Sequence, residues 1–272
     1  MINEDIKKFS EFLDYYKEDY GKPSWEISIP NPEDEDFNEN EEKIPLVNSN
    51  YIMLDFDSMC RDSDFYPKET WDECNRPSTV DGLYYRILNE NKLELFLVEF
   101  KTFYFTWNNK LYYNNALKKI KELRNCNPSF KLEKGIEMFE NIEKKLGNSI
   151  ECSLKLKPYE SLFVVLPKIY EEYCKEKNIV ECDKIDLYNL FKSDLCIIKL
   201  CIVGKQYPND STRAYLGKLG NSLEKQYKRL DFVNVLIQHP QRLCFENEFD
   251  SLTNKLRLHE HENLKSLNYD GS

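Results

Sequence analysis

The sequence predicts a mixed α/β fold, with a sheet of about four or five strands flanked by helices. Two adjacent segments rich in Tyr, Leu, Val and Phe indicate a β-hairpin, and residues 195–203 form a further apolar run typical of a buried strand. Segments with helical spacing of apolar residues lie between these strands. A chain of 272 residues that is 41% hydrophobic can bury the core of such a fold.

The N-terminal part of the chain reads as a helix followed by a linker. Apolar residues recur three or four positions apart over residues 4–20, which predicts an amphipathic helix. Residues 21–49 contain four prolines and the run Glu33–Asp36, which favour a solvated linker. Residues 51–56 are expected to form a short strand or the entry to a helix that runs from Asp57.

The predicted hairpin consists of strands at 79–88 and 92–105, joined by Asn89-Glu90-Asn91, which has the composition of a turn. Helices and strands then follow in the order α, α, α, β, α, β at about 111–125, 131–146, 158–177, 195–203, 212–230 and 232–238. We expect Pro167 to kink the third of these helices. The domain boundaries that follow are 1–49 for the helix and acidic linker, 50–250 for the core and 251–272 for a polar helical tail.

Charge and motif content exclude several classes of protein. The net charge is −10, but residues 1–80 hold 21 acidic and 8 basic residues while residues 81–272 hold 27 and 30, so the predicted core is near neutral. No apolar run is long enough for a membrane span, and no signal-peptide pattern or glycine-rich phosphate loop occurs. The nine cysteines lack metal-ligand spacing. We therefore expect reduced, mostly buried thiols in a cytoplasmic protein that has no membrane partner.

The predicted hairpin carries the strongest candidates for catalytic or metal-binding residues. With a three-residue loop, residues whose numbers sum to 180 face each other, so Asp81 lies across from Glu99 and both point to one face of the sheet. Period-two alternation places Lys101 on the same face. Opposed carboxylates, with Cβ atoms about 5 Å apart, repel each other unless a cation neutralises them. A hard divalent ion suits such a pair.

The energetic cost of burying the charged residues of the second strand supports the interpretation of this pair as a metal site. Leu93, Leu95 and Leu97 alternate with Phe96, Val98 and Phe100, so both faces of the second strand are apolar, as in a central strand. Glu99 and Lys101 interrupt this pattern. Buried charges persist when they are paired or bind a metal.

Asp81 followed by Val98-Glu99-Phe100-Lys101 in an apolar strand resembles the PD-(D/E)XK nuclease superfamily. The resemblance covers about residues 50–240 and implies a restriction-endonuclease-like core. It also implies that Asp81 and Glu99 bind Mg²⁺ or Mn²⁺, that Phe100 lends its carbonyl to the metal, and that Lys101 assists the attacking water.

Two further candidates follow from this resemblance, because many relatives place a polar residue of a later helix beside the site. Lys157 and Ser161 are similar to such residues, although Pro158 is expected to start the helix and leave Lys157 just outside it. Val80 replaces the proline of the family motif. A third acidic ligand is left open among Glu11, Asp55, Asp57 and Glu73.

The resemblance implies a magnesium-dependent nuclease that hydrolyses phosphodiester bonds of nucleic acid, with DNA favoured over RNA. The alternative is a catalytically inactive nuclease-like scaffold that binds protein or nucleic acid. The oligomeric state stays open, with a homodimer as one option. We also hypothesise that residues 21–49 act as a DNA-mimicking flap over the basic helix expected at 212–230.

Overall fold

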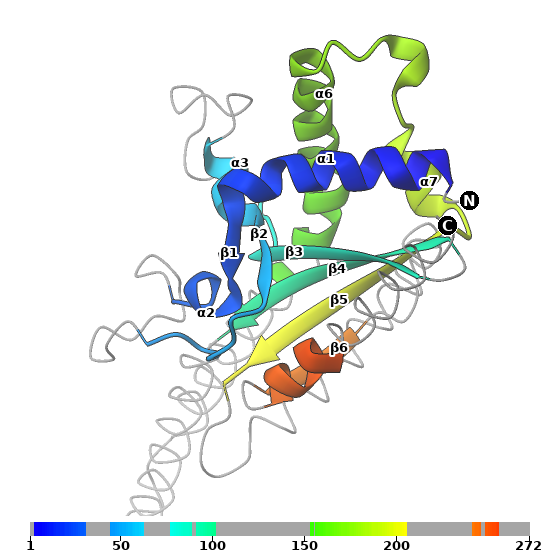
Figure 1. Ribbon diagram of the computed structural model, residues 1–272. Coiled ribbons are helices and arrows are strands. Elements are labelled where there is room, and N and C mark those ends of the chain that lie inside the picture. The colour runs from blue at the N-terminus through cyan, green and yellow to red at the C-terminus, as the bar shows by residue number, and fades with distance from the viewer. Residues whose placement is uncertain are drawn as a thin grey trace, which may run out of the picture.

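The computed structural model describes residues 3–30, 44–62, 77–88, 91–101, 153–154, 156–205, 241–245 and 248–255, of which 241–245 are described by their backbone alone. These residues form a six-stranded mixed sheet in the order β1-β2-β3-β4-β5-β6 (Figure 1). The strands are β1 (Gly21–Pro23), β2 (Ile52–Asp55), β3 (Gly82–Leu88), β4 (Lys92–Lys101), β5 (Cys196–Gly204) and β6 (Gln241–Phe245). Neighbours are antiparallel from β1 to β4 and parallel from β4 to β6.

The helices flank this sheet, which confirms the predicted α/β class. They are α1 (Glu4–Tyr20), α2 (Ser24–Ile27), α3 (Phe56–Asp62), the π-helical turn η2 (Ser161–Val165), α6 (Leu166–Glu176), the 3₁₀ turn η3 (Glu181–Asp183) and α7 (Leu187–Lys192). Residues 156–160 and 248–255 are also helical. No helix within these described ranges has the length and apolar character needed to cross a bilayer. The helices expected at 111–125, 131–146 and 212–230 and the strand expected at 232–238 lie outside the described residues.

The hairpin has the predicted register. Leu88 pairs with Lys92 and Gly82 with Val98, so paired residue numbers sum to 180 along the whole of β3. Asn91 in the turn has a φ of 56°, a left-handed conformation that Asn tolerates better than most residues. The first strand begins at residue 82 rather than 79, which leaves Asp81 in the irregular segment directly before β3.

Alternation along β4 divides the molecule into two apolar cores, as predicted. Leu93, Leu95 and Leu97 join a core with residues of α1, α3, η2, α6, α7 and β5. The intervening Phe96 and Val98 face a second core, which is closed by residues of the 44–54 segment and of the helix at 248–255. In Figure 1, α1 and α6 lie on one side of the sheet and the helix at 248–255 lies on the other. Glu99 and Lys101 have the parity of the first face, the one that the α6 segment covers.

The segment between β4 and β5 returns to the sheet through helical structure that holds the later site residues. Residues 156–160 are helical, so Lys157 lies inside a helix, and the expectation that it lies just outside is wrong. The restriction that proline places on its preceding residue is a preference, and the fold overrides it here. Pro167 lies in the first turn of α6, directly after the π-turn η2, and the kink expected at this proline stays a prediction.

The expectation of a solvated linker over all of residues 21–49 is wrong for the described part of that segment. Residues 21–23 form β1, an edge strand, where proline is tolerated. The hydroxyl of Ser28 accepts a hydrogen bond from the Val47 backbone N–H at 3.1 Å, and Val47 is buried. Deleting residues 21–49 would remove a strand and part of a core, so this deletion cannot test a flap; the acidic run at 33–36 lies outside the described residues. At the other end of the chain, the described residues 248–255 are helical and Leu252 is buried, so the helix expected in the tail is present before residue 251.

Candidate functional site

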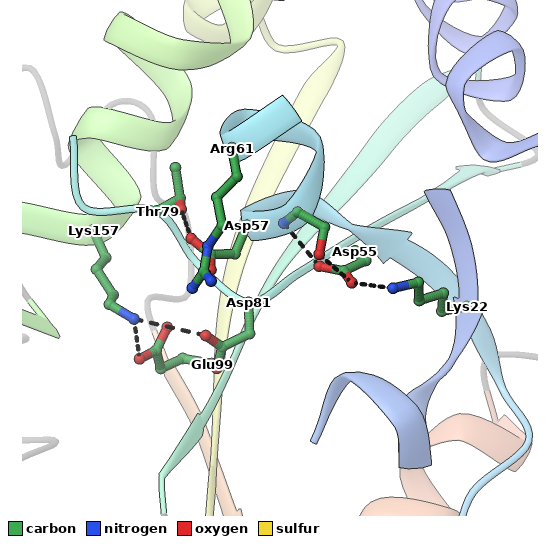
Figure 2. A network of polar contacts seen from close by, with 9 residues as sticks. Lys22, Asp55, Asp57, Arg61, Thr79, Asp81, Glu99 and Lys157 are labelled. Atoms are coloured by element: carbon green, nitrogen blue, oxygen red, sulfur yellow. Dashed lines mark hydrogen bonds and ion pairs between the residues drawn. The ribbon is translucent and has the colours of Figure 1, made fainter. Parts of the chain in front are cut away.

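The end of the β3–β4 hairpin brings the two predicted carboxylates together. Asp81 immediately precedes Gly82, which pairs with Val98, so Asp81 lies beside β4 at the level of Glu99. The Phe100 backbone N–H donates a hydrogen bond to Asp81 Oδ2 at 2.6 Å, which fixes the Asp81 side chain against β4. Figure 2 shows the two carboxylates facing one another. The register argument therefore placed these residues correctly.

Lys157 reaches this pair from the helical residues 156–160. Its Nζ lies 2.6 Å from Glu99 Oε1 and 3.7 Å from Asp81 Oδ1, and Figure 2 shows it extending toward both. The Lys157 side chain is 14% exposed and that of Glu99 only 1%. Because both side chains are largely buried, solvent and salt screen this ion pair far less than they screen one on the surface. Lys157, expected at the edge of the site, is the cation that bridges its two acids.

Lys101 completes the group that we call the charge cluster: Asp81, Glu99, Lys101 and Lys157. Lys101 Nζ lies 3.4 Å from Glu99 Oε1, the same oxygen that Lys157 contacts. Two carboxylates and two ammonium groups give the cluster a formal charge of zero. The structure thus brings together four of the predicted site residues, from the residue before β3, from β4 and from the helical residues 156–160 that lie on the crossover from β4 to β5.

One oxygen of the charge cluster bears on metal binding. Glu99 Oε2 is buried and has no hydrogen-bond partner among the described residues. A buried acceptor without a partner is costly, and a cation at this oxygen would remove that cost. Asp81 supplies a second carboxylate, so the donor type fits a hard divalent ion such as Mg²⁺. A group of three or more His, Cys, Asp or Glu that could hold a metal does not occur within the part of the chain that the structure describes.

The proton affinities in the cluster follow from burial and from its charges. Burial, together with the neighbouring Glu99 charge, raises the pKa of Asp81 to about 7, although Lys157 and Lys101 act in the opposite direction. The side chain of Asp81 keeps 25% of its surface exposed, so it can exchange protons with solvent. Burial acts to lower the pKa of Lys157, but the charges of Glu99 and Asp81 outweigh it and raise that pKa above its ordinary value. Lys157 therefore stays charged at neutral pH.

The raised pKa of Asp81 predicts a specific pH dependence of stability. Between the ordinary value of 3.8 and about 7, the unfolded chain releases the Asp81 proton while the folded protein retains it, so stability falls as pH rises. Asp81→Asn should remove this fall and increase the free energy of unfolding at pH 8 by about 2 kcal/mol. Urea unfolding at several pH values measures the effect. Asp19→Asn, at an exposed position on α1, is the control; a parallel pH profile for wild type and Asp81→Asn would contradict the prediction.

Asp57 is the described candidate for a third acid whose link to the charge cluster the structure shows. Its charge acts directly on Lys157. Asp57 Oδ1 accepts a hydrogen bond from Thr79 Oγ1 at 2.7 Å, and Oδ2 pairs with Arg61 at 2.5 Å (Figure 2). Thr79 and Arg61 were not predicted, although the four-residue spacing of Asp57 and Arg61 on α3 is an ordinary signal of a helical ion pair. Glu73 lies outside the described residues.

The structure gives the other two acids different partners. Asp55 accepts hydrogen bonds from the Ser58 backbone N–H and hydroxyl at 3.0 and 2.7 Å, and it pairs with Lys22 of β1 at 2.9 Å. It therefore ties β1 and α3 to the end of β2. Glu11 is 56% exposed on α1 and lies 3.8 Å from Lys7.

Ser161 holds the Asp81 segment in place. It is fully buried, and its Oγ accepts a hydrogen bond from the Val80 backbone N–H at 3.0 Å. One residue earlier, Glu160 Oε2 accepts from the Ser78 backbone N–H at 2.5 Å. The predicted proximity of Ser161 to the site is thus observed, and its contacts are those of a residue that positions Asp81.

Replacing Ser161 by alanine should destabilise the protein by about 1–3 kcal/mol, because the buried Val80 N–H would lose its acceptor. Chemical denaturation measures this loss. Ser10→Ala, which removes a hydroxyl that donates to the Lys7 carbonyl near the surface of α1, is the matched control and should cost less. Equal losses for the two variants would show that the Val80 N–H finds another partner.

Phe100 takes part in the site through its backbone. Its N–H binds Asp81, while its ring packs on the other face of the sheet against Phe249, with ring centroids 5.6 Å apart. The role expected for its carbonyl stays a prediction.

Among the described residues, the cysteine side chains lie outside the charge cluster. Cys60, Cys174, Cys196 and Cys201 are buried and Cys182 is exposed, in keeping with the expectation of mostly buried thiols.

Comparison of the chain with protein-family models, with curated proteins and with solved structures found no match. The interpretation of the site therefore depends on the residues themselves.

Proposed function

We propose that this protein is a magnesium-dependent nuclease that hydrolyses phosphodiester bonds of nucleic acid, with DNA as the favoured substrate. The proposal depends on one observation above all. Two carboxylates, one with a buried oxygen that has no partner among the described residues, meet two lysines at the end of a central hairpin. The restriction-endonuclease-like character of the fold belongs to the same proposal, and the mixed sheet supports it.

Each residue of the charge cluster has a role in this reaction. Asp81 and Glu99 would hold the divalent ion, and the chemistry that such an ion would supply there is activation of water and neutralisation of charge on the phosphate. Lys101, on the strand that carries Glu99, orients the attacking water beside the scissile phosphate. Lys157 supplies a second positive charge for the phosphate oxygens. Ser161 and the Phe100 N–H keep Asp81 at the correct level of the sheet.

A second candidate function is a nuclease-like scaffold that binds a partner without catalysis. The feature that favours it is the neutrality of the charge cluster, since two lysines already balance two carboxylates. Such a protein needs no divalent ion to hold its site together.

Incubation of the purified full chain with single- and double-stranded DNA and RNA separates the two functions. The nuclease should cut at least one of these substrates in the presence of Mg²⁺ or Mn²⁺, and EDTA should stop the reaction. If neither ion supports cleavage of any of the four substrates, the nuclease proposal is wrong and the scaffold is favoured.

A further inference from the structure

The position of Lys157 bears on how a divalent ion reaches the charge cluster. The Lys157 ammonium contacts both carboxylates that the proposed function assigns to the ion, at 2.6 Å from Glu99 and 3.7 Å from Asp81. Its side chain is 14% exposed, so few water molecules share this contact. The Lys157 ammonium therefore lies beside the same pair of carboxylates that a divalent metal ion would use.

Charge balance makes the divalent ion and Lys157 compete for the carboxylates of Asp81 and Glu99. With both carboxylates ionised the cluster is neutral, and one divalent ion alone would then bring its charge to +2 around a glutamate that is 1% exposed. Excess charge of one sign is unfavourable in a poorly solvated site. A phosphodiester anion restores part of the balance, and it also offers Lys157 an alternative partner.

Lys157 is better suited to this role than Lys101. Lys101 lies two residues from Glu99 on the same strand, whereas Lys157 extends from a separate helical segment that runs into the π-turn η2. Lysine carries its charge on a flexible four-carbon stem, and π-turns are often found at functional sites. The charge of Asp57 also acts on Lys157 and gives the ammonium a second anionic neighbour.

We propose that Lys157 is a resident counter-ion that competes with the divalent ion for Asp81 and Glu99, so that ion binding is weak in the protein alone and strengthens when a phosphodiester is bound. This inference rests on the proposed function and adds a regulatory element to it. The coupling is reciprocal, because a ligand that raises the affinity of the ion must have its own affinity raised by the ion to the same extent.

The test measures Mg²⁺ affinity directly, by calorimetry on the full chain. Lys157→Met should bind Mg²⁺ at least about tenfold more tightly than wild type. Lys7→Met, which removes an exposed charge on α1, should leave the affinity unchanged. Lys101→Met should give a smaller gain than Lys157→Met, because the bridge to both acids is kept. If Lys157→Met does not fold, Lys157→Gln removes the same charge and should show the same direction of change.

A second measurement adds a phosphorothioate oligonucleotide, which resists cleavage. It should tighten Mg²⁺ binding to wild type by about fivefold or more, and tighten binding to Lys157→Met much less. Equal or weaker Mg²⁺ binding by Lys157→Met, or equal gains for Lys157→Met and Lys101→Met, would overturn the inference. If wild type still cleaves nucleic acid in that case, the proposed function survives. If neither wild type nor the variants bind Mg²⁺ or Mn²⁺, both proposals fail.

Discussion

Replacing Lys101 or Asp81 by alanine is expected to lower the rate of nucleic-acid cleavage by about a thousandfold or more, with the fold intact. Lys101 stands 3.4 Å from Glu99 and supplies charge where it develops during attack on phosphorus. Asp81 is one of the two carboxylates that would hold the divalent ion. Initial rates on a fluorescent oligonucleotide, at saturating Mg²⁺, measure the effect.

Two comparisons make this result specific to the site. Lys7→Ala removes an exposed charge on α1 that is not part of the charge cluster, and it should retain the wild-type rate. Circular dichroism of each variant should match that of wild type, since the hairpin register depends on backbone pairing that neither substitution touches. Wild-type rates in Lys101→Ala would mean that any cleavage comes from another site or from a contaminant.

Replacing Glu94 by alanine should destabilise the protein by about 3 kcal/mol. Glu94 is buried on the face of β4 opposite the charge cluster, between Arg86 of β3, 2.5 Å from Oε2, and Lys199 of β5, which contacts Oε1. Burial opposes ionisation of Glu94, but hydrogen bonds from Lys199 and Arg86 outweigh it and hold its pKa below the ordinary value. Without the carboxylate, Arg86, which is 12% exposed, would keep an uncompensated charge.

Denaturation at pH 7 measures the loss, and its pH dependence checks the cause. A lowered pKa gives stability that is present above the ordinary value for glutamate and is lost as pH falls through the folded value, so wild type and Glu94→Ala should converge in acid. The triple variant Arg86→Met, Glu94→Leu, Lys199→Met replaces the whole group by apolar side chains and should recover most of the loss. A loss below about 0.5 kcal/mol in Glu94→Ala, the range of surface substitutions, would contradict this account.

The elements that could be predicted from the sequence are those specified by local pattern. Alternation and turn composition gave the register of β3 and β4, and helical spacing gave α1 with its bounds. The same register placed Asp81, Glu99 and Lys101 together, because a hairpin pairs residues that are close in sequence.

Other parts depend on contacts between distant segments and could not be predicted in this way. Strand β1 exists because it pairs with β2 about thirty residues later, at Lys22 and Met53 for example, and its own composition indicates a linker. The contact between Lys157 and Glu99 joins residues 58 positions apart in the sequence. The local sequence around Lys157 instead emphasised Pro158, which was expected to leave Lys157 outside the helix. The ionic group around Glu94 was missed, although a glutamate within an apolar strand is itself a signal.

The two hydrogen bonds that Ser161 and Glu160 accept from the residues before β3 have a consequence for folding order. They join positions 81 and 82 residues apart, whereas the hairpin closes over a three-residue turn. Local contacts form early and long loops close late, so the hairpin can pair before the crossover helix arrives. At that stage the two carboxylates at its open end have no lysine from the helix between them. We therefore expect completion of the site to be a late step of folding, reached after the segment between β4 and β5 has packed onto the sheet.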